Sequence, residues 1–291
     1  MSLPKILLFG RVGQVGWELR RTLAPMSPLV CVDYPEVDLT RPDSIRKWIR
    51  DAAPEIIINA AAYTAVDKAE SEVALATKIN AEAPGVMAEE AAQRGALLVH
   101  YSTDYVFDGA KRSPYVEEDA PNPLGAYGRT KLAGDRAIQR TGCNHLIFRL
   151  CWVYGARGAN FMLTMMRLAR EREVLRVVRD QLGCPTWSRM IAEATALALL
   201  QIPPEQAAAR TGVYHLCASG QTSWHGFAQA IVDLMPANSR KCREVEAISS
   251  SEFPTPTKRP PYSVMSGAKL ERIFGLKLPD WRESLRLVLE T

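Results

Sequence analysis

A tyrosine and a lysine stand four positions apart in the segment YGRTK, at Tyr127 and Lys131. On a helix, this spacing puts the two side chains on one face. A phenol with its ordinary pKa of about 10 is a poor acid or base at neutral pH, and a nearby cation lowers that pKa by stabilising the phenolate. The pair predicts a phenol that transfers a proton, although the same pattern also arises by accident on exposed helices.

Two hydroxyl side chains, Ser102 and Thr103, directly follow an apolar run that reads as a strand. In a doubly wound sheet, strand ends face the crevice in which ligands bind. Thr103 can then offer its hydroxyl to the substrate oxygen whose proton Tyr127 handles. Together these residues predict a hydride-transfer site in which Tyr127, Lys131 and Thr103 are catalytic.

A third group of residues has the spacing of a phosphate-binding turn. Gly10, Gly13 and Gly16 form a G-x-x-G-x-x-G pattern after the first apolar run. Glycines at such a turn let backbone N–H groups approach a pyrophosphate, and the N-terminus of the following helix favours the anion. The spacing differs from the G-x-G-x-x-G dehydrogenase pattern, so an ordinary glycine-rich turn is the alternative interpretation. The preceding strand, the following helix and Asp33 favour a dinucleotide-binding turn over that alternative.

The choice of dinucleotide depends on two residues with opposite effects. Asp33 ends the second expected strand, where a carboxylate hydrogen bonds the adenosine ribose and repels a 2′-phosphate. Arg11, inside the glycine turn, can instead pair with that phosphate. We therefore expect NADPH to bind, with NADH as a second cofactor.

These residues need a scaffold that brings strand ends and helix starts together. Short apolar runs predict strands at 5–9, 29–32, 55–59, 96–101 and 145–150. Helical stretches lie between them, one starting after a segment like a capping box at Thr40–Asp43 and one over about 81–93. Near-continuous apolar strands alternating with helices predict an α/β fold with a doubly wound parallel sheet, Rossmann-like in class.

The pattern loosens after about residue 151. Residues 162–172 and 190–200 read as helices, and 174–178 and 213–216 as strands. We expect a dinucleotide-binding domain over 1–155 and a smaller, partly interleaved substrate domain, mainly over 156–291. The strands near 174–178 and 213–217 are expected to rejoin the first domain.

Composition excludes several classes of protein. The 36 basic and 32 acidic residues are interspersed, which argues against a nucleic-acid-binding arm. Nothing approaches the roughly 20 apolar residues that span a bilayer, and the opening segment reads as a strand, so a cytoplasmic protein without a membrane partner is expected. The six scattered cysteines and four histidines lack metal-ligand spacing. Trp17, Trp48, Trp224 and Trp281 read as core residues.

Longer segments carry a resemblance to a known family. LLFGRVGQVGWEL, INAAAYTAVDKAE, VHYSTDYVFDG, YGRTKLAG, FRLCWVYG and DQLGCPT resemble extended short-chain dehydrogenase/reductases, and among them the dTDP-4-dehydrorhamnose reductase family. The segment YVFDG, together with Trp152 and Tyr154, is more specific than the glycine turn. The resemblance implies reduction of the 4-keto group of dTDP-4-dehydro-6-deoxy-L-mannose to dTDP-L-rhamnose, the last step in forming a precursor of cell-surface polysaccharide.

The resemblance also implies which residues contact each ligand, beside those that the patterns above already indicate. Hydride would come from NADPH or NADH, the proton from Tyr127, and Lys131 would hold the nicotinamide ribose. The expected cofactor-binding residues are Gly10, Arg11, Gly13, Gln14, Val15, Asp33, Asp38, Leu39, Ala60, Ala62, Tyr63, Thr64, Tyr101, Tyr127 and Lys131. The expected substrate-binding residues are Thr103, Asp104, Tyr105, Trp152, Asn160, Gln181 and Arg259.

Members of this family bind Mg²⁺ between subunits through carboxylates. Glu18 is suited to that role, but Arg189 stands in a stretch where an acidic ligand is expected, and few carboxylates precede Thr291. No metal ligand is therefore predicted. We expect a monomer or a homodimer that is not bridged by magnesium.

Two other functions fit part of the pattern. An epimerase or dehydratase of another nucleotide sugar would retain its NAD, and Asp104 stands where a dehydratase has its acid; the segment YVFDG favours the reductase. A non-catalytic NADP-binding subunit, like the regulatory subunit of methionine adenosyltransferase, is the second alternative. Intact Thr103, Tyr127 and Lys131 argue against it.

Overall fold

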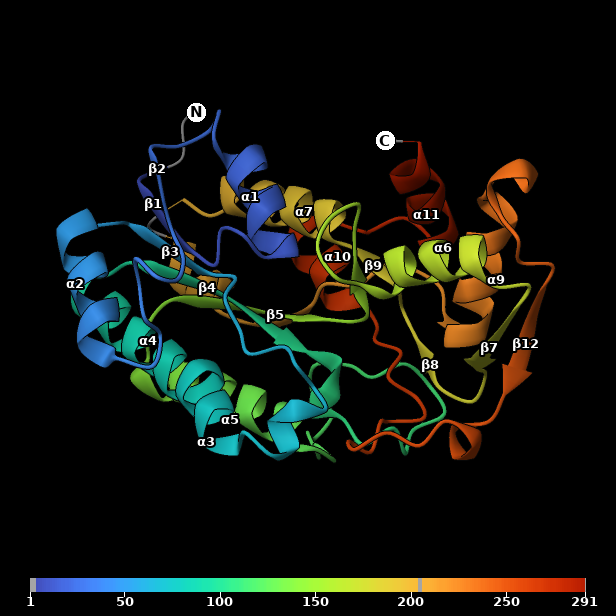
Figure 1. Cartoon of the computed structure of the whole chain (residues 1–291). Coiled ribbons are helices and arrows are strands. Elements are labelled where there is room, and N and C mark those ends of the chain that lie inside the picture. Colours follow the sequence, from blue (N-terminus) through green and yellow to red (C-terminus); the bar gives the residue numbers. More distant parts are fainter. Residues whose placement is uncertain (1–3, 204–205, 291) are drawn as a thin grey trace.

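A parallel sheet of six strands forms the centre of the chain, whose computed structural model describes residues 4–203 and 206–290 (Figure 1). Its strand order is β2-β1-β3-β4-β5-β10, and every neighbouring pair is parallel. The expected α/β fold is confirmed. The strands are β1 (Ile6–Phe9), β2 (Leu29–Val32), β3 (Ile56–Asn59), β4 (Leu97–Thr103), β5 (His145–Leu150) and β10 (Gly212–His215).

Both faces of this sheet are covered, which explains why its central strands are apolar throughout. Every residue of β1, β3 and β4 is buried. Because side chains alternate along a strand, Ile6 and Leu8 point into one core while Leu7 and Phe9 point into the other.

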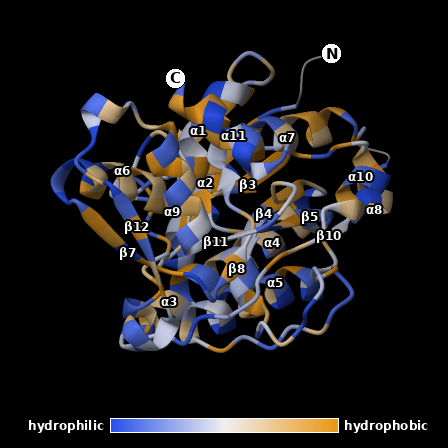
Figure 2. Cartoon of the chain, turned by 90° about the vertical axis from the view of Figure 1, so that its right-hand side faces the viewer, coloured by the Kyte–Doolittle hydropathy of each residue, from blue (hydrophilic) through white to orange (hydrophobic). Residues whose placement is uncertain are grey.

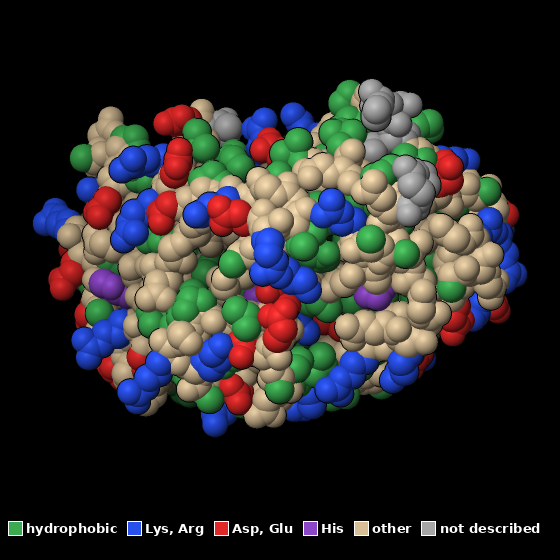
Figure 3. Space-filling view, turned by 180° about the vertical axis from the view of Figure 1, so that it is seen from behind, with side chains coloured by type: hydrophobic (Ala, Val, Ile, Leu, Met, Phe, Trp, Pro, Cys, Tyr) green, Lys and Arg blue, Asp and Glu red, His purple; other side chains and the backbone are tan. Residues whose placement is uncertain are grey.

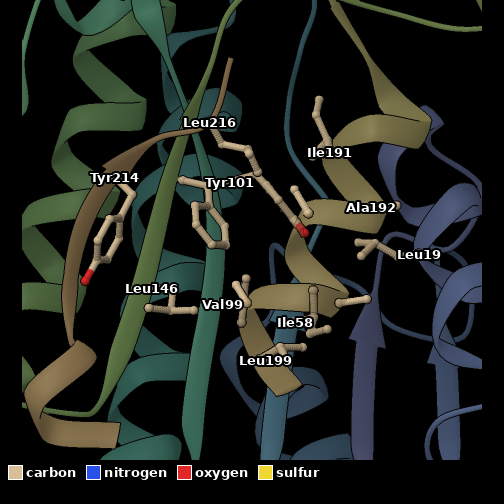
Figure 4. Close-up of a cluster of buried hydrophobic side chains, with 14 of the residues drawn as sticks. Leu19, Ile58, Val99, Tyr101, Leu146, Ile191, Ala192, Leu199, Tyr214 and Leu216 are labelled. Carbon is tan, nitrogen blue, oxygen red and sulfur yellow. The ribbon is translucent and has the colours of Figure 1, made fainter. Parts of the chain in front are cut away.

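Three helices pack on one face and three on the other. The first face carries α1 (Gln14–Leu23), α7 (Ser188–Leu200) and α10 (Ala268–Phe274), and Figure 4 shows Leu19, Ile191 and Leu199 of this layer meeting side chains of the sheet. The second face carries α2 (Pro42–Ala52), α4 (Ala83–Arg94) and α5 (Ala126–Thr141). The helix starts of α1 and α5 therefore lie near the strand ends that the site requires.

Two local expectations differ from the structure. The helix expected from about residue 81 is preceded by α3 (Val73–Thr77) and one π-helical turn, η2 (Lys78–Glu82). Within that turn, Asn80 is buried and hydrogen bonds the backbone of Tyr63 on both sides. The capping box at the start of α2 is wrong, because Arg41 is the N-cap residue and the Thr40 hydroxyl donates to Asp38 instead.

The later part of the chain builds a second core beside the sheet. Helices α6 (Phe161–Glu171), α9 (Trp224–Leu234) and α11 (Trp281–Leu289) pack together around Phe227 and Trp281 (Figure 2). Strands β7 (Val174–Val178) and β12 (Glu244–Ile248) contribute Leu175, Val177 and Val245 to the same core. We expected the strand at 174–178 to rejoin the main sheet, but β7 pairs with β12 in a separate two-stranded sheet. By contrast, β10 lies at the edge of the main sheet, beside β5.

The remaining elements are short. They are β6 (Val153–Tyr154) with β9 (Thr186–Trp187), β8 (Leu182–Gly183) with β11 (Thr222–Ser223), α8 (Ala207–Arg210), and the 3-10 turns η1 (Lys68–Glu70), η3 (Asp104–Val106), η5 (Ala237–Ser239) and η6 (Ser250–Glu252).

Charges of both signs are interspersed on the face of the molecule seen in Figure 3. This arrangement agrees with the nearly balanced count of basic and acidic residues in the sequence. Within the described ranges, no helix has the length and apolar character needed to cross a membrane.

Candidate active site

A cavity of about 550 Å³ opens at the carboxyl ends of β1, β3, β4 and β5. β2 and β3 flank β1 on opposite sides, so the strand order reverses direction at β1. Doubly wound sheets bind their ligands in the crevice beside such a reversal. The expected residues that line the cavity are Gly10, Gly13, Gln14, Val15, Asp33, Ala60, Ala62, Thr64, Tyr101, Thr103, Asp104, Tyr105, Tyr127, Lys131, Trp152 and Arg259.

The glycine turn is shaped by contacts that no side chain would allow. Gly10 has φ +86°, and a Cβ there would lie 2.5 Å from the backbone nitrogen of Ala61. A Cβ at Gly16 would lie 1.9 Å from the carbonyl oxygen of Gly10. Gly13 is the N-cap of α1, without a side-chain cap. The first N–H groups of α1 are thus left for a ligand at the cavity wall.

Asp33 and Arg11 are both engaged within the protein. The Asp33 carboxylate accepts hydrogen bonds from the backbone N–H groups of Val12 and Tyr34. The Arg11 guanidinium donates to the Cys31 carbonyl at 2.9 Å and pairs with Glu36 at 2.8 Å. The hydrogen bond from Arg11 lowers the pKa of Glu36. Arg11 lines neither this cavity nor the neighbouring one, and its partner Glu36 was not predicted from the sequence.

A second cavity of about 340 Å³ adjoins the first and shares four lining residues with it: Gly10, Asp33, Ala61 and Ala62. Asp38 and Leu39, which were expected beside the adenosine, lie in its wall. The two cavities together form an extended site that crosses the edge of the sheet.

Residues after β3 line the main cavity on one side. Ala60, Ala62 and Thr64 contribute to its wall, whereas Tyr63 does not. The Tyr63 hydroxyl donates to Glu72 at 2.6 Å, and its backbone is held by Asn80 of the π-helical turn. Asn80 therefore fixes the segment that would run along a cofactor, a role that depends on a contact distant in sequence.

Tyr127 lies in the first turn of α5 and lines the cavity beside Thr103. Burial raises the pKa of Tyr127 to about 12, against a hydrogen bond with Thr103 that lowers it. The ring of Tyr105 meets that of Tyr127 edge to face, with centroids 5.6 Å apart. The phenol is consequently protonated at neutral pH, and the lowering of its pKa that was expected from Lys131 is not found, because burial outweighs it.

Lys131 lies one turn further along α5 and is buried. Its Nζ donates to the Tyr101 carbonyl at 2.6 Å and lies 3.2 Å from Nε2 of His100. Burial lowers the pKa of Lys131 to about 8, against the attraction of Asp135, which raises it. The side chain of Tyr101 lies in the core layer of Figure 4, where its hydroxyl hydrogen bonds Thr195.

Asp104 is a buried carboxyl at the inner end of the cavity. Burial raises its pKa to about 6, although hydrogen bonds from Ser263, Cys151 and Thr103 lower it in part. Two hydroxyl or thiol donors reach the carboxylate directly, Thr103 at 3.1 Å and Cys151 at 3.3 Å.

A stacked pair of indoles forms another part of the cavity wall. Trp152 and Trp224 lie parallel, with ring centroids 3.5 Å apart. Trp152 has φ +46°, a strained backbone for a bulky residue, and strain of this kind concentrates at functional sites. The expectation that Trp224 belongs to the core holds only in part, since it packs against the second core but is half-buried and lines the cavity. Its helical spacing resembles that of Trp281, which is buried.

The remaining expected residues divide into two groups. Arg259 reaches the cavity, where it pairs with Asp67 at 3.1 Å and donates to the Tyr105 hydroxyl at 3.4 Å. Asn160 and Gln181 do not line the cavity. Asn160 caps α6 and donates to the Gln14 side chain, and Gln181 donates to Ser250.

The site contains further lining residues that were not predicted from the sequence. They are Val12, Ala61, Val66, Ser102, Leu150, Val153, Ala159 and Trp224. Most are small or apolar residues next to assigned ones, so only their position in the fold identifies them.

The carboxylate considered for magnesium has a cationic neighbour. Burial raises the pKa of Glu18, and the nearby Arg189 lowers it. Arg189 itself pairs with Glu193 at 3.1 Å. Among the described residues, no group of three or more His, Cys, Asp or Glu side chains is arranged to hold a metal ion.

Comparison with known proteins places the chain in a family. The model for the RmlD substrate binding domain matches residues 4–291. A dTDP-4-dehydrorhamnose reductase of Burkholderia thailandensis is 49% identical over 289 residues, which cover 97% of each chain.

Two solved structures have the same fold. A dTDP-4-dehydrorhamnose reductase of Clostridium acetobutylicum is 36% identical with a TM-score of 0.91, covering 98% of both chains. That of Bacillus anthracis, in complex with NADP, is 33% identical with a TM-score of 0.91 and full coverage of both. The resemblance found in the sequence is confirmed: this chain belongs to the RmlD family of dTDP-4-dehydrorhamnose reductases.

Proposed function

We propose that the chain reduces the 4-keto group of dTDP-4-dehydro-6-deoxy-L-mannose to give dTDP-L-rhamnose. The observation that carries this proposal is the meeting of Tyr127, Lys131 and Thr103 with the glycine turn in one cavity. The names of relatives that are 49% and 44% identical support the same reaction.

The residues of the site fit a nicotinamide dinucleotide. Side chains at Gly10 and Gly16 would collide with neighbouring backbone, so the turn stays open for close approach of a pyrophosphate to the start of α1. Asp33 lies where the two cavities meet, and Asp38 and Leu39 lie in the smaller one, which suits the adenosine half. The chemistry supplied by bound NADPH is hydride transfer to the carbonyl carbon.

The protein supplies and places the proton. Tyr127 enters the reaction as a neutral phenol and protonates the oxygen that gains charge as the carbonyl is reduced. Thr103 holds that oxygen through its hydroxyl. Lys131 carries the positive charge that stabilises the phenolate left on Tyr127, which lies one helical turn away.

The sugar and its diphosphate occupy the side of the cavity opposite the glycine turn in this proposal. Asp104, Tyr105 and Trp152 are placed to contact the sugar, and the Arg259 guanidinium suits a phosphate through its planar fork. Residues 1–155 with β10 would then bind the dinucleotide, and 156–291 would mainly bind the nucleotide sugar.

We infer that NADPH is the preferred reductant and that NADH also serves. The solved relative with NADP supports the first part. Asp33, which lies where the two cavities meet, and Arg11, whose charge is paired with Glu36, support only partial discrimination between NADPH and NADH.

Product analysis tests the proposed reaction. Incubated with NADPH and enzymatically prepared dTDP-4-dehydro-6-deoxy-L-mannose, the full chain should yield dTDP-L-rhamnose and one NADP⁺ for each sugar reduced. An epimerase or dehydratase would change the sugar without net consumption of NADPH. Tight NADPH binding with no change in the sugar would instead indicate a regulatory subunit and overturn the proposal.

A further inference from the structure

A buried polar cluster surrounds Lys131 between α5 and the strands β3, β4 and β5. Its members are Asn59 at the end of β3, His100 and Ser102 in β4, Lys131 and Asp135 on α5, and Arg149 in β5, each no more than about 5% exposed. Nothing in the proposed reaction uses Asn59 or His100. Buried polar groups of this kind are retained where their hydrogen bonds specify an arrangement.

The orientation of the Asn59 amide is fixed by the backbone. The Ala61 N–H donates to Oδ1 of Asn59 at 3.2 Å, so the other end of the amide, Nδ2, faces His100. Nδ2 lies 3.1 Å from Nδ1 of the imidazole. Because an amide NH₂ is only a donor, Nδ1 of His100 must be the acceptor.

A neutral imidazole carries one proton, so the acceptor at Nδ1 places the N–H at Nε2. Burial and the nearby Lys131 charge lower the pKa of His100 well below its ordinary value, which keeps the ring neutral. The Nε2–H then points to Nζ of Lys131, 3.2 Å away, and to Oδ1 of Asp135, 4.0 Å away. That carboxylate oxygen has no hydrogen-bond partner within the described part of the chain.

Two N–H donors, Nζ of Lys131 and Nε2 of His100, consequently face each other between α5 and β4. An ammonium has only N–H groups to offer, and the imidazole presents an N–H to it as well. The lysine in its neutral form, by contrast, has a lone pair that accepts the Nε2–H. The tautomer of His100 therefore disfavours the ammonium of Lys131, in addition to the effect of burial.

We propose that Asn59 and His100 are a positioning pair that directs the imidazole Nε2–H at Lys131 and so makes the buried ammonium of Lys131 more acidic than burial alone would. The proposal rests on the proposed reaction only where the pH dependence of kcat is used to read the protonation of Lys131. The hydrogen-bond arrangement can be tested without turnover.

Other charged groups around the pair act on it from every side. Asp135 favours the ammonium of Lys131, and it also pairs with Arg149 at 3.6 Å. Ser102 donates to the other oxygen of Asp135 at 2.8 Å, leaving Oδ1 for His100. The titratable groups on the cavity side are Tyr127 and Asp104.

Ring ¹⁵N NMR of the full chain, with NADP⁺ bound, reads the tautomer directly. Two other histidines are references for the opposite tautomer, with the proton on Nδ1. Nδ1 of His145 and Nδ1 of His215 each face a backbone carbonyl and must therefore carry the proton. His225, whose Nε2 faces the Val245 carbonyl, is the reference for the expected tautomer. The His100 signals are identified by their loss in His100→Gln.

We expect the His100 pattern to match His225 in the wild-type protein and to match His145 in Asn59→Asp. The aspartate accepts from Nδ1–H, which turns the lone pair of Nε2 toward Lys131. The alkaline loss of kcat, assigned to deprotonation of Lys131, should then move up by about one pH unit. In the double variant Asn59→Asp/His100→Gln this upward shift should largely disappear. The comparison therefore distinguishes an effect of the His100 tautomer from an effect of the charge added at residue 59.

A wild-type His100 protonated at Nδ1 overturns the proposal, and this reading does not require the variants to fold or to turn over. An equal shift in pH dependence with and without His100 would also overturn it, because charge alone would then account for the change. If the expected tautomer is found but the protein has no reductase activity, the proposed reaction is overturned and the positioning pair is not.

Discussion

The backbone of Gly183 lies flat against the indole of Trp152, so that a Cβ atom at residue 183 would approach Cε2 of the ring to 2.4 Å. Trp224 stacks on the same indole with an interplanar angle of 7°. The indole is therefore clamped between a glycine and a second indole, at the cavity wall that we assign to the sugar. Its strained backbone, with φ +46°, is maintained by these contacts.

Gly183→Ala should weaken binding of the nucleotide sugar while sparing the dinucleotide. The added methyl group must push Trp152 out of its position, and we expect KM for the sugar to rise about tenfold, equivalent to about 1.4 kcal/mol. The Kd for NADPH, measured by fluorescence titration, should stay within twofold. Gly275→Ala is the control: its φ of +64° also penalises a side chain, but its Cβ would meet no atom within 4 Å. Equal KM changes in both variants would refute the clamp.

Gly16→Ala should destabilise the protein and abolish tight binding of NADPH. Its Cβ would overlap the Gly10 carbonyl at 1.9 Å, and overpacking of this kind costs about 1–3 kcal/mol. Urea unfolding measures the loss. Gly13→Ala provides the comparison, since its Cβ would find its nearest atom at an ordinary 3.5 Å and φ is −64°. A Gly16 variant as stable as the Gly13 variant would show that the close packing is not needed.

Removing the charge of Glu36 should increase discrimination in favour of NADPH. In Glu36→Gln, Arg11 loses its 2.8 Å ion pair and becomes available to a 2′-phosphate. We expect the ratio of kcat/KM for NADPH to that for NADH to rise about tenfold, the scale of one hydrogen bond to a charged group. Glu89→Gln removes a similar ion pair, with Arg46, and should leave the ratio unchanged. A fall in the ratio for Glu36→Gln would contradict this role of Arg11.

Asp104 should give the protein a characteristic dependence of stability on pH. Its pKa is raised from 3.8 to about 6, so the folded state binds the proton more tightly than the unfolded state. The associated stability is fully present below about pH 4 and is lost as the pH rises through 6; at about 1.4 kcal/mol per pH unit it amounts to about 3 kcal/mol. The difference in unfolding free energy between wild type and Asp104→Asn should fall by this amount from pH 4 to pH 7. A constant difference would mean that the carboxyl is not held in its neutral form.

The sequence predicted the parts of the fold that depend on local pattern. Strands β1, β2, β3 and β5 were found within one residue of their bounds because a parallel sheet covered on both faces leaves an unbroken apolar run. The Tyr127 and Lys131 pair was placed correctly on one helix because helical spacing is itself local.

The parts that the sequence did not predict depend on distant contacts. β7 reads like another strand of the main sheet, and only its pairing with β12, far along the chain, places it elsewhere. The sequence spacing of Trp224 is that of a core residue, and only the fold shows that the indole of Trp152 stacks on it at the cavity. Asn80 and His100 look like isolated polar residues, because their partners belong to other elements.

The most direct test of the central claim is the rate of NADPH oxidation with dTDP-4-dehydro-6-deoxy-L-mannose, measured for the wild type beside Tyr127→Phe. Loss of the phenol hydroxyl should lower kcat by about 10²–10⁴-fold, the usual worth of a positioned acid, with the Kd for NADPH nearly unchanged. A Tyr127→Phe variant that retained the wild-type kcat would contradict the account, because the proton would then come from another group.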